Sequence, residues 1–158
     1  MDIGSGKEYP SSALSNFAPH KFIFRGVQCN SMEGLLQSFK FSSPEMQKHV
    51  CTLVGRAAKM KGKDKNWKTT QTLWWDGNPI KRDSKEYQDL LDEAFEAMRD
   101  GSESFRKALL ASGKAVLAHS IGRTKENDTV LTVREFCSRL TDMRAFLQAK
   151  QIGIKFKE

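Results

Sequence analysis

Three polar side chains in one short segment have the residue types and the spacing to do chemistry. Glu33, Gln37 and Lys40 lie within "NSMEGLLQSFKF" (residues 30–41). Because they follow one another at i, i+4 and i+7, they would share one stripe of a helix. A half-buried carboxylate can stabilise a developing cation or act as a general base. A lysine beside it can bind phosphate, or act as a nucleophilic amine if its pKa is lowered.

This polar stripe borders the apolar face of the same segment. It is offset by roughly a quarter turn from the centre of that face, which is formed by Met32, Leu35, Leu36 and Phe39. An edge position of this kind suits the wall of a cleft. The other interpretation is that Asn30 and Glu33 have capping-box spacing, so that Glu33 only caps the helix. Gln37 and Lys40 would then be a solvated face, and the residues alone leave both interpretations open.

The surrounding segments predict a mainly helical, single α+β domain with a small β-sheet. Residues 21–30 alternate and contain an Arg25-Gly26 turn, which predicts a short hairpin. A second turn is expected at Asp76-Gly77. The remaining predicted elements are helices over 30–41, 43–62, 83–101, 102–113 and from 132 onward, and a buried strand over 115–121.

Length and charge limit the domain organisation and the class of partner. The chain has 158 residues, which suits one domain. We expect residues 1–12 to be loosely ordered, residues 13–150 to form the domain and residues 151–158 to be a C-terminal tail. The net charge of +7 favours an anionic partner such as nucleic acid, a nucleotide or another phosphorylated ligand, although it also serves solubility.

Cysteine usage and hydropathy exclude several classes of protein. The three cysteines are far apart and lack metal-ligand spacing, which argues against a disulfide framework or a zinc site. No apolar run approaches a membrane span, and the first residues lack the features of a signal peptide. No phosphate-loop or dinucleotide-binding motif is present. We therefore expect a cytoplasmic protein with no metal, no cofactor and no membrane partner.

A basic and aromatic region covers residues 56–75 and contains Lys59 and Trp67. Cationic and aromatic side chains together suit phosphate contacts and base stacking. The alternatives are a solvated helix face for the lysines and core packing for the tryptophans. Further along, His119 lies in an apolar run, where a lone histidine is usually a hydrogen-bonded core residue.

Several segments resemble the YbiA-like family, also called the NADAR domain. "LSNF" (residues 14–17) and "SMEGLLQSFKF" (residues 31–41) are similar to its L-S-N-F and S-x-E-x-x-x-Q-x-x-K signatures. "GRAAKMKGK" (residues 55–63) and Trp67 resemble its A-x-K-x-x-G stretch and the tryptophan that follows. Residues 105–120 resemble its late strand entry, so the resemblance covers most of the chain. This resemblance implies that the chain has the α+β, YbiA-like fold.

The chain departs from the family pattern near its late strand. His119 stands where family members often carry a glutamate, and no W-G-x-G segment follows it. In this respect the chain resembles a divergent branch of phage-encoded members. The resemblance implies an N-glycosidase, a hydrolase that acts on a phosphorylated N-riboside. Its substrate would be ADP-ribose attached to guanine in nucleic acid, which the positive charge favours, or a ribosylamino-pyrimidine phosphate of riboflavin synthesis.

The resemblance also implies roles for individual residues. Glu33 would stabilise oxocarbenium character at C1′ or deprotonate the attacking water, and Lys40 would hydrogen-bond the ribose or attack C1′. Gln37 would orient Glu33 or the substrate. The substrate-binding residues would be Asn16, Phe17, Ser31, Gln37, Lys59, Trp67 and His119.

Two competing functions remain open at this point. One is a non-catalytic module that binds ADP-ribose, a nucleotide or nucleic acid through the same pocket. The other is a nucleic-acid-binding protein without a pocket, whose binding would depend steeply on salt and not on Glu33. Convergence of Glu33 and Lys40 on one ligand atom would favour the enzyme, and a bare helix cap at Glu33 would favour the binding module.

Overall fold

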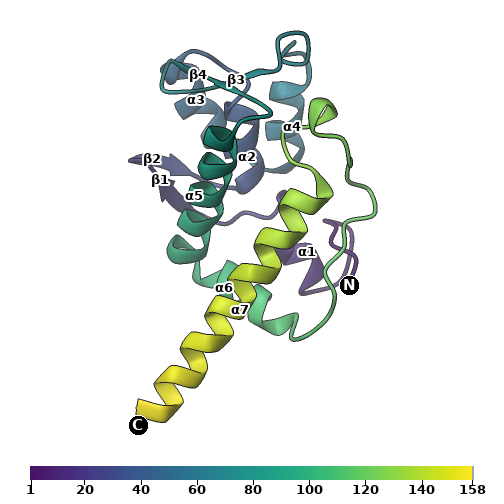
Figure 1. Cartoon of the computed structure of the whole chain (residues 1–158), viewed down its shortest axis with the longest axis vertical. Helices are drawn as coiled ribbons and strands as arrows, with labels where there is room; N and C mark the ends of the chain where they lie inside the picture. Colours follow the sequence, from purple (N-terminus) through teal and green to yellow (C-terminus); the bar gives the residue numbers. More distant parts are fainter. Residues whose placement is uncertain (158) are drawn as a thin grey trace.

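The computed structural model describes residues 1–157, with side chains described as far as Gly153 (Figure 1). Its elements in chain order are α1 (Ser11–Leu14), β1 (Phe22–Phe24), β2 (Val27–Cys29), α2 (Met32–Ser38), α3 (Pro44–Cys51), α4 (Gly55–Lys63), β3 (Thr72–Trp75), β4 (Asn78–Lys81), α5 (Lys85–Gly101), α6 (Glu103–Ala111), the 3₁₀ turn η1 (Glu126–Asp128) and α7 (Val133–Lys157). The predicted mainly helical α+β domain is confirmed.

The strands form two separate antiparallel hairpins. Ile23 pairs with Gln28 in the first hairpin, and Leu73 pairs with Ile80 in the second. Both predicted turns are confirmed. Each turn places its two central residues at positive φ, which a two-residue type I′ hairpin requires and which glycine adopts without strain.

Helix α2 lies at the centre of the fold and packs against α3, α4 and α5. Gly34 makes this approach possible, because a Cβ there would lie 2.7 Å from the carbonyl oxygen of Leu53. Leu35 and Phe39 of α2 are fully buried in the core. Phe39 packs edge-on against Trp75 of β3, with ring centroids 5.9 Å apart. The helix that carries the polar stripe is therefore fixed on several sides.

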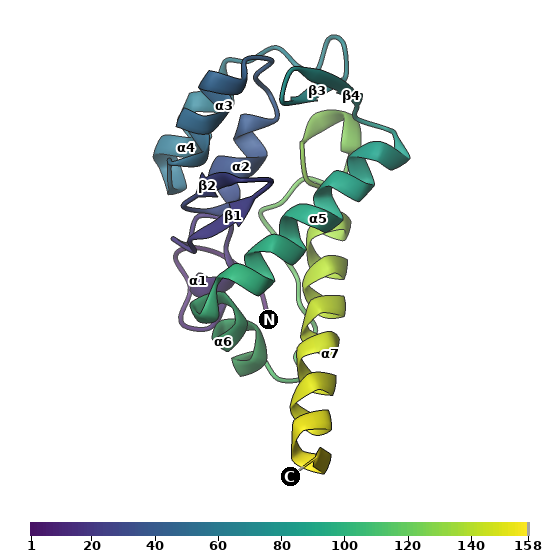
Figure 2. The same ribbon diagram turned by 90° about the vertical axis from the view of Figure 1, so that its left-hand side faces the viewer.

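Helices α5, α6 and α7 complete the core, and the C-terminal end of α7 projects from the rest of the chain (Figure 2). Helix α7 begins with a capping box. The Thr132 amide donates to the Glu135 carboxylate over 2.8 Å, and the Glu135 amide donates to the Thr132 hydroxyl over 3.1 Å. Such a reciprocal pair satisfies backbone donors that a helix start leaves free.

Two predicted elements were wrong. The single helix expected over 43–62 is divided into α3 and α4 by a turn at Gly55, whose φ of +57° glycine tolerates. The buried strand expected over 115–121 is a loop with one parallel bridge, between Asp2 and Ala118. Val116 is 83% exposed, because this apolar run finds only a short stretch of chain to pair with.

The two ends of the chain also differ from expectation. Residues 1–12 were expected to be loosely ordered, yet Ile3 is buried in the core and its amide donates to the Ala118 carbonyl over 2.8 Å. The expected C-terminal tail over 151–158 continues α7 as far as Lys157. Residue 158 lies outside the described residues.

A buried arginine holds the loop that precedes α7. The Arg82 guanidinium is fully buried, and it donates two hydrogen bonds to the Glu135 carboxylate over 2.6 and 3.1 Å. Its Nε donates to the Thr129 carbonyl over 2.9 Å, and the Tyr87 hydroxyl donates to the neighbouring Val130 carbonyl over 2.5 Å. The loop is therefore anchored to α5 and α7 from inside the protein.

We expect Glu135→Gln to destabilise the protein far more than Glu93→Gln. Removing one charge of a buried pair costs about 3–5 kcal/mol, whereas the Arg25–Glu93 pair is exposed and such pairs contribute about 1 kcal/mol or less. Urea unfolding at neutral pH measures both losses, and equal losses would contradict the expectation.

Urea unfolding of wild type and Glu135→Gln in acid tests how the contribution of Glu135 depends on pH. Burial opposes ionisation of Glu135, but hydrogen bonds from Arg82 and Gln88 outweigh it and hold its pKa below the usual value. The stabilisation by ionised Glu135 is fully present above the pKa that this residue has in the unfolded chain. It is lost as the pH falls through the lower pKa that Glu135 has in the folded protein. The difference in the free energy of unfolding between wild type and Glu135→Gln should shrink in this acidic range.

Candidate active site

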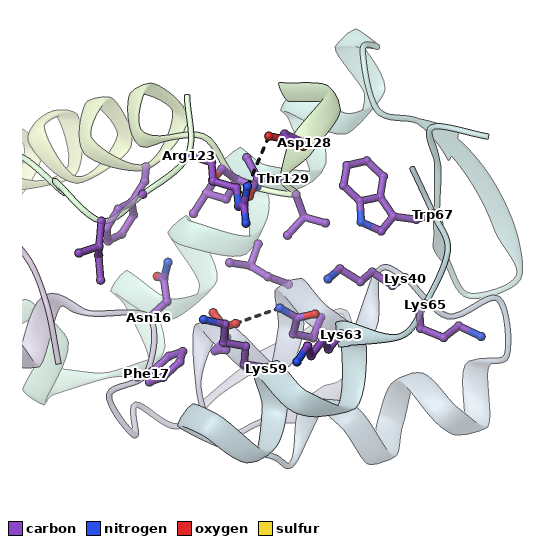
Figure 3. A pocket seen from close by; sticks show the side chains of 18 of the residues that line it. Asn16, Phe17, Lys40, Lys59, Lys63, Lys65, Trp67, Arg123, Asp128 and Thr129 are labelled. Atoms are coloured by element: carbon purple, nitrogen blue, oxygen red, sulfur yellow. Dashed lines mark hydrogen bonds and ion pairs between the residues drawn. The ribbon is translucent and has the colours of Figure 1, made fainter. Parts of the chain in front are cut away.

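A cavity of about 600 Å³ lies between α2, α4, the segment after α4, the loop before α7 and α7 itself (Figure 3). This volume is in the range of small-molecule sites. Glu33, Gln37 and Lys40 all line it, so the structure brings the predicted polar stripe together on one wall. The prediction of a cleft at the edge of the core is confirmed in this respect.

Glu33 is not the cap of its helix. The N-cap is Ser31, whose hydroxyl accepts a hydrogen bond from the Gly34 amide over 3.0 Å and donates to the Leu53 carbonyl over 2.9 Å. The capping signature assigned to Asn30 was therefore wrong by one residue. Ser31 is fully buried and is not among the residues that line the cavity, where the sequence had placed it as a substrate-binding residue. The Glu33 carboxylate is left free to face the cavity.

The protein environment opposes the charge on Glu33. Burial raises the pKa of its carboxyl group, while a hydrogen bond from Gln37 and the charges of Lys40, Lys59 and His119 act in the opposite direction. The Gln37 amide donates to Glu33 Oε1 over 2.9 Å. A carboxylate that water solvates poorly gains more from a cation that develops beside it than an exposed one does.

Lys40 completes the polar stripe. It is half-buried, and burial lowers the pKa of its ammonium group, with the charge of Glu33 acting against that shift. Its Nζ donates to the Gly62 carbonyl of α4 over 3.4 Å. A lowered pKa makes the neutral, nucleophilic amine more accessible.

Gln37 occupies a tight space between α2 and α4. A Cβ at Gly62 would lie 1.9 Å from Gln37 Oε1, so only glycine lets α4 approach this closely. Gln37 Oε1 is buried and has no hydrogen-bond partner among the described residues, while Nε2 is directed to Glu33. The close approach thus fixes the amide that holds the carboxylate.

Cationic side chains surround the entrance of the cavity (Figure 3). They are Lys59, Lys63, Lys65, Lys68 and Arg123. Lys68 and Arg123 contact the Asp128 carboxylate over 3.3 and 3.5 Å, so their charges are partly neutralised. Lys65 lies over the Phe41 ring, with Nζ 4.9 Å from the centroid. The excess of positive charge suits an anionic ligand.

The other predicted site residues also line the cavity. The Asn16 carbonyl accepts a hydrogen bond from the Glu33 amide over 3.0 Å, and Asn16 Oδ1 is buried with no partner among the described residues. Trp67 is only 5% exposed, so it serves the core as well as the cavity wall. Phe17 lies at the turn that begins α4, beside Gly55. The His119 ring packs edge-on against Phe136, with centroids 5.4 Å apart.

Sequence reasoning missed most of the opposite wall. Thr129, Val130, Leu131 and Phe136 line the cavity from the loop before α7 and from α7. No local pattern marks them, because their position depends on the distant Arg82 and Tyr87 contacts. Among the described residues, no group of three or more His, Cys, Asp or Glu side chains could hold a metal ion, and no helix is long and apolar enough to cross a membrane.

We expect Gly62→Ala to lower the stability of the protein by about 1–3 kcal/mol, because the added methyl group overpacks the contact with Gln37. The matched control is Gly153→Ala in α7, where nothing lies within 4 Å of the added Cβ. Alanine favours a helix over glycine, so that variant should be neutral or more stable by up to about 1 kcal/mol. Urea unfolding of both variants is the measurement, and equal behaviour would contradict the close contact.

We expect Glu33→Gln to raise the melting temperature at neutral pH. Burial raises the pKa of Glu33, so the folded state binds this proton more tightly than the unfolded chain does. Stability is therefore lost as the pH rises through this range, and an uncharged residue avoids the loss.

Thermal unfolding from about pH 4 to pH 8 measures this effect. The gain in melting temperature should shrink toward the acid end, where the carboxyl becomes increasingly protonated in both states. Glu45→Gln, on the exposed surface of α3, is the control. A gain that does not depend on pH would contradict the electrostatic cause.

Comparison with known proteins agrees with this fold. Residues 8–145 match the family described as bacteriophage protein GP30.3. The chain is 38% identical over 147 residues to the 17.1 kDa protein of the Gp30–rIII intergenic region of Enterobacteria phage T4, covering 91% of this chain and 96% of that protein. The solution structure of the Escherichia coli protein YbiA has the same fold, with a TM-score of 0.63 at 18% identity over 96% of this chain and 86% of YbiA. The predicted YbiA-like fold of a phage-type branch is thereby confirmed, and the chain belongs to the bacteriophage protein GP30.3 family.

Proposed function

We propose that this protein is an N-glycosidase, a hydrolase that cleaves the N-glycosidic bond of a phosphorylated N-riboside. One observation carries the proposal: the half-buried Glu33 carboxylate, held by Gln37 and accompanied by Lys40, faces a 600 Å³ cavity with a cationic entrance. The YbiA-like fold is consistent with it.

The residue types suit the chemistry of this bond. As the base departs from C1′, positive charge spreads over C1′ and the ring oxygen, and a nearby carboxylate stabilises it. Burial strengthens that attraction, because little water competes with it. Glu33 also has the means to accept a proton from the water that attacks C1′, since its raised pKa improves it as a base at neutral pH.

Lys40 acts beside Glu33 in one of two ways. As an ammonium group it donates hydrogen bonds to the ribose hydroxyls. As a neutral amine, which its lowered pKa makes more accessible, it attacks C1′ and forms an imine after the ring opens. Trapping with borohydride separates the two, because only an imine is reduced to a stable covalent adduct.

The favoured substrate is ADP-ribose attached to guanine in nucleic acid. Its diphosphate would contact the lysines at the entrance, its ribose would contact Asn16, and a base would stack on Phe17 or Trp67. The buried Asn16 Oδ1 without a partner supports this arrangement, because a ribose hydroxyl would satisfy it. A ribosylamino-pyrimidine phosphate fits the same chemistry and is the second substrate to test.

We expect the wild type to release ADP-ribose from guanine-ADP-ribosylated DNA, and Glu33→Gln to slow this by about 10²–10³-fold. Chromatography of the released ADP-ribose is the measurement. Glu45→Gln, which removes an exposed carboxylate from α3, should retain the wild-type rate.

Other outcomes point to other functions. Equal release by wild type and Glu33→Gln would move the chemistry away from Glu33. No release, with ADP-ribose bound tightly, would favour the non-catalytic binding module. Release only from a ribosylamino-pyrimidine phosphate would keep the glycosidase and change its substrate.

A further inference from the structure

His119 is held by one ring nitrogen and open at the other. Its Nδ1 lies 2.8 Å from the Ile3 carbonyl oxygen. A carbonyl only accepts hydrogen bonds, so Nδ1 carries a proton in both the neutral and the charged ring. The neutral ring then has its lone pair on Nε2, and Nε2 becomes a proton donor only when the ring is an imidazolium.

The second nitrogen has no partner within the described residues. No hydrogen bond is made by His119 Nε2, and the buried polar side-chain atoms without a partner are Asn16 Oδ1 and Gln37 Oε1. His119 Nε2 is therefore not sealed from solvent. His119 also lines the cavity, so its ring is within reach of a substrate bound there.

The surrounding residues fix the orientation of the ring. Phe136 of α7 packs edge-on against it, with the two ring planes at 80°. Gly122 also lies close to the ring, since a Cβ there would lie 2.6 Å from His119 Cδ2. Together with the hydrogen bond from Nδ1 to Ile3, these contacts fix the orientation of the ring. A group that donates a proton to a bound substrate needs such a fixed orientation.

Two carboxylates lie near His119, Glu33 on α2 and Asp2 in the N-terminal segment. Hydrogen bonds from the Ser120 amide and hydroxyl, over 2.8 and 2.6 Å, lower the pKa of Asp2, and a charge on His119 acts in the same direction. Burial raises the pKa of Glu33, and a charge on His119 acts against that shift.

We propose that protonated His119 is the general acid that protonates the departing base. This inference rests on the proposed glycosidase function. The C1′–N bond breaks and its electron pair passes to the leaving nitrogen, which takes the proton from His119 Nε2. Water bonds to C1′ and gives its proton to Glu33. That proton returns through solvent to His119, so the sum of the steps is the addition of one water across the glycosidic bond.

The test compares two leaving groups on the same ADP-ribose. One is guanine in DNA, a poor leaving group that needs a proton. The other is 4-nitrophenoxide at C1′, which leaves readily as an anion. The main variant is His119→Asn, whose amide still donates to the Ile3 carbonyl. His119→Gln provides a second variant if the first unfolds. The matched control is His49→Asn, on the exposed surface of α3.

We expect His119→Asn to lower kcat for the guanine substrate by about 10²–10⁴-fold, and to change the release of 4-nitrophenol by less than about 3-fold. Glu33→Gln should slow both substrates, because both pass through the same cation at C1′.

Equal losses on the two substrates would overturn the proposal and leave His119 as a binding residue. Unchanged rates on both would overturn it as well. If the wild type cleaves neither substrate, the glycosidase function itself fails and the role of His119 fails with it.

Discussion

The contact between α2 and α4 at Gly62 is the constraint on which the candidate site depends. It leaves Gln37 no room to turn, and so it fixes the amide that donates to Glu33. It also brings the Gly62 carbonyl within reach of Lys40. A carboxylate and an ammonium group thus line the same cavity in half-buried positions, where neither is fully solvated. Each has its pKa shifted toward the neutral form by burial.

The opposite wall depends on a different set of buried polar contacts. Arg82 binds Glu135 and the Thr129 carbonyl, and Tyr87 binds the Val130 carbonyl. These contacts give an irregular loop a fixed position over the cavity. The two walls therefore have separate supports, one steric and one electrostatic. Between them lie the cationic entrance and the buried Asn16 oxygen, which suit an anionic riboside.

The sequence predicts features that short-range geometry decides. The hairpin turns and the Thr132–Glu135 capping box involve residues a few positions apart, and both are present. The same holds for Glu33 and Gln37, which helical spacing places on one face of α2, whereas Lys40 follows the end of that helix.

Features that depend on distant partners could not be predicted in this way. Ser31 caps α2 in place of Asn30 because its hydroxyl also reaches Leu53. The apolar run over 115–121 has the composition of a strand but meets only the short N-terminal segment. The loop before α7 joins the site through Arg82, which lies 47 positions before Thr129. Long-range hydrogen bonds decide each of these cases, and no local pattern records them.

A crystal structure of the Glu33→Gln variant with ADP-ribose would test the central claim most directly, because the variant should bind the ligand without turning over a riboside. The account predicts that C1′ lies between the side chain at position 33 and Lys40 Nζ, with the diphosphate on the lysines at the entrance. Binding of ADP-ribose outside the cavity, or with C1′ turned away from these two side chains, would contradict it.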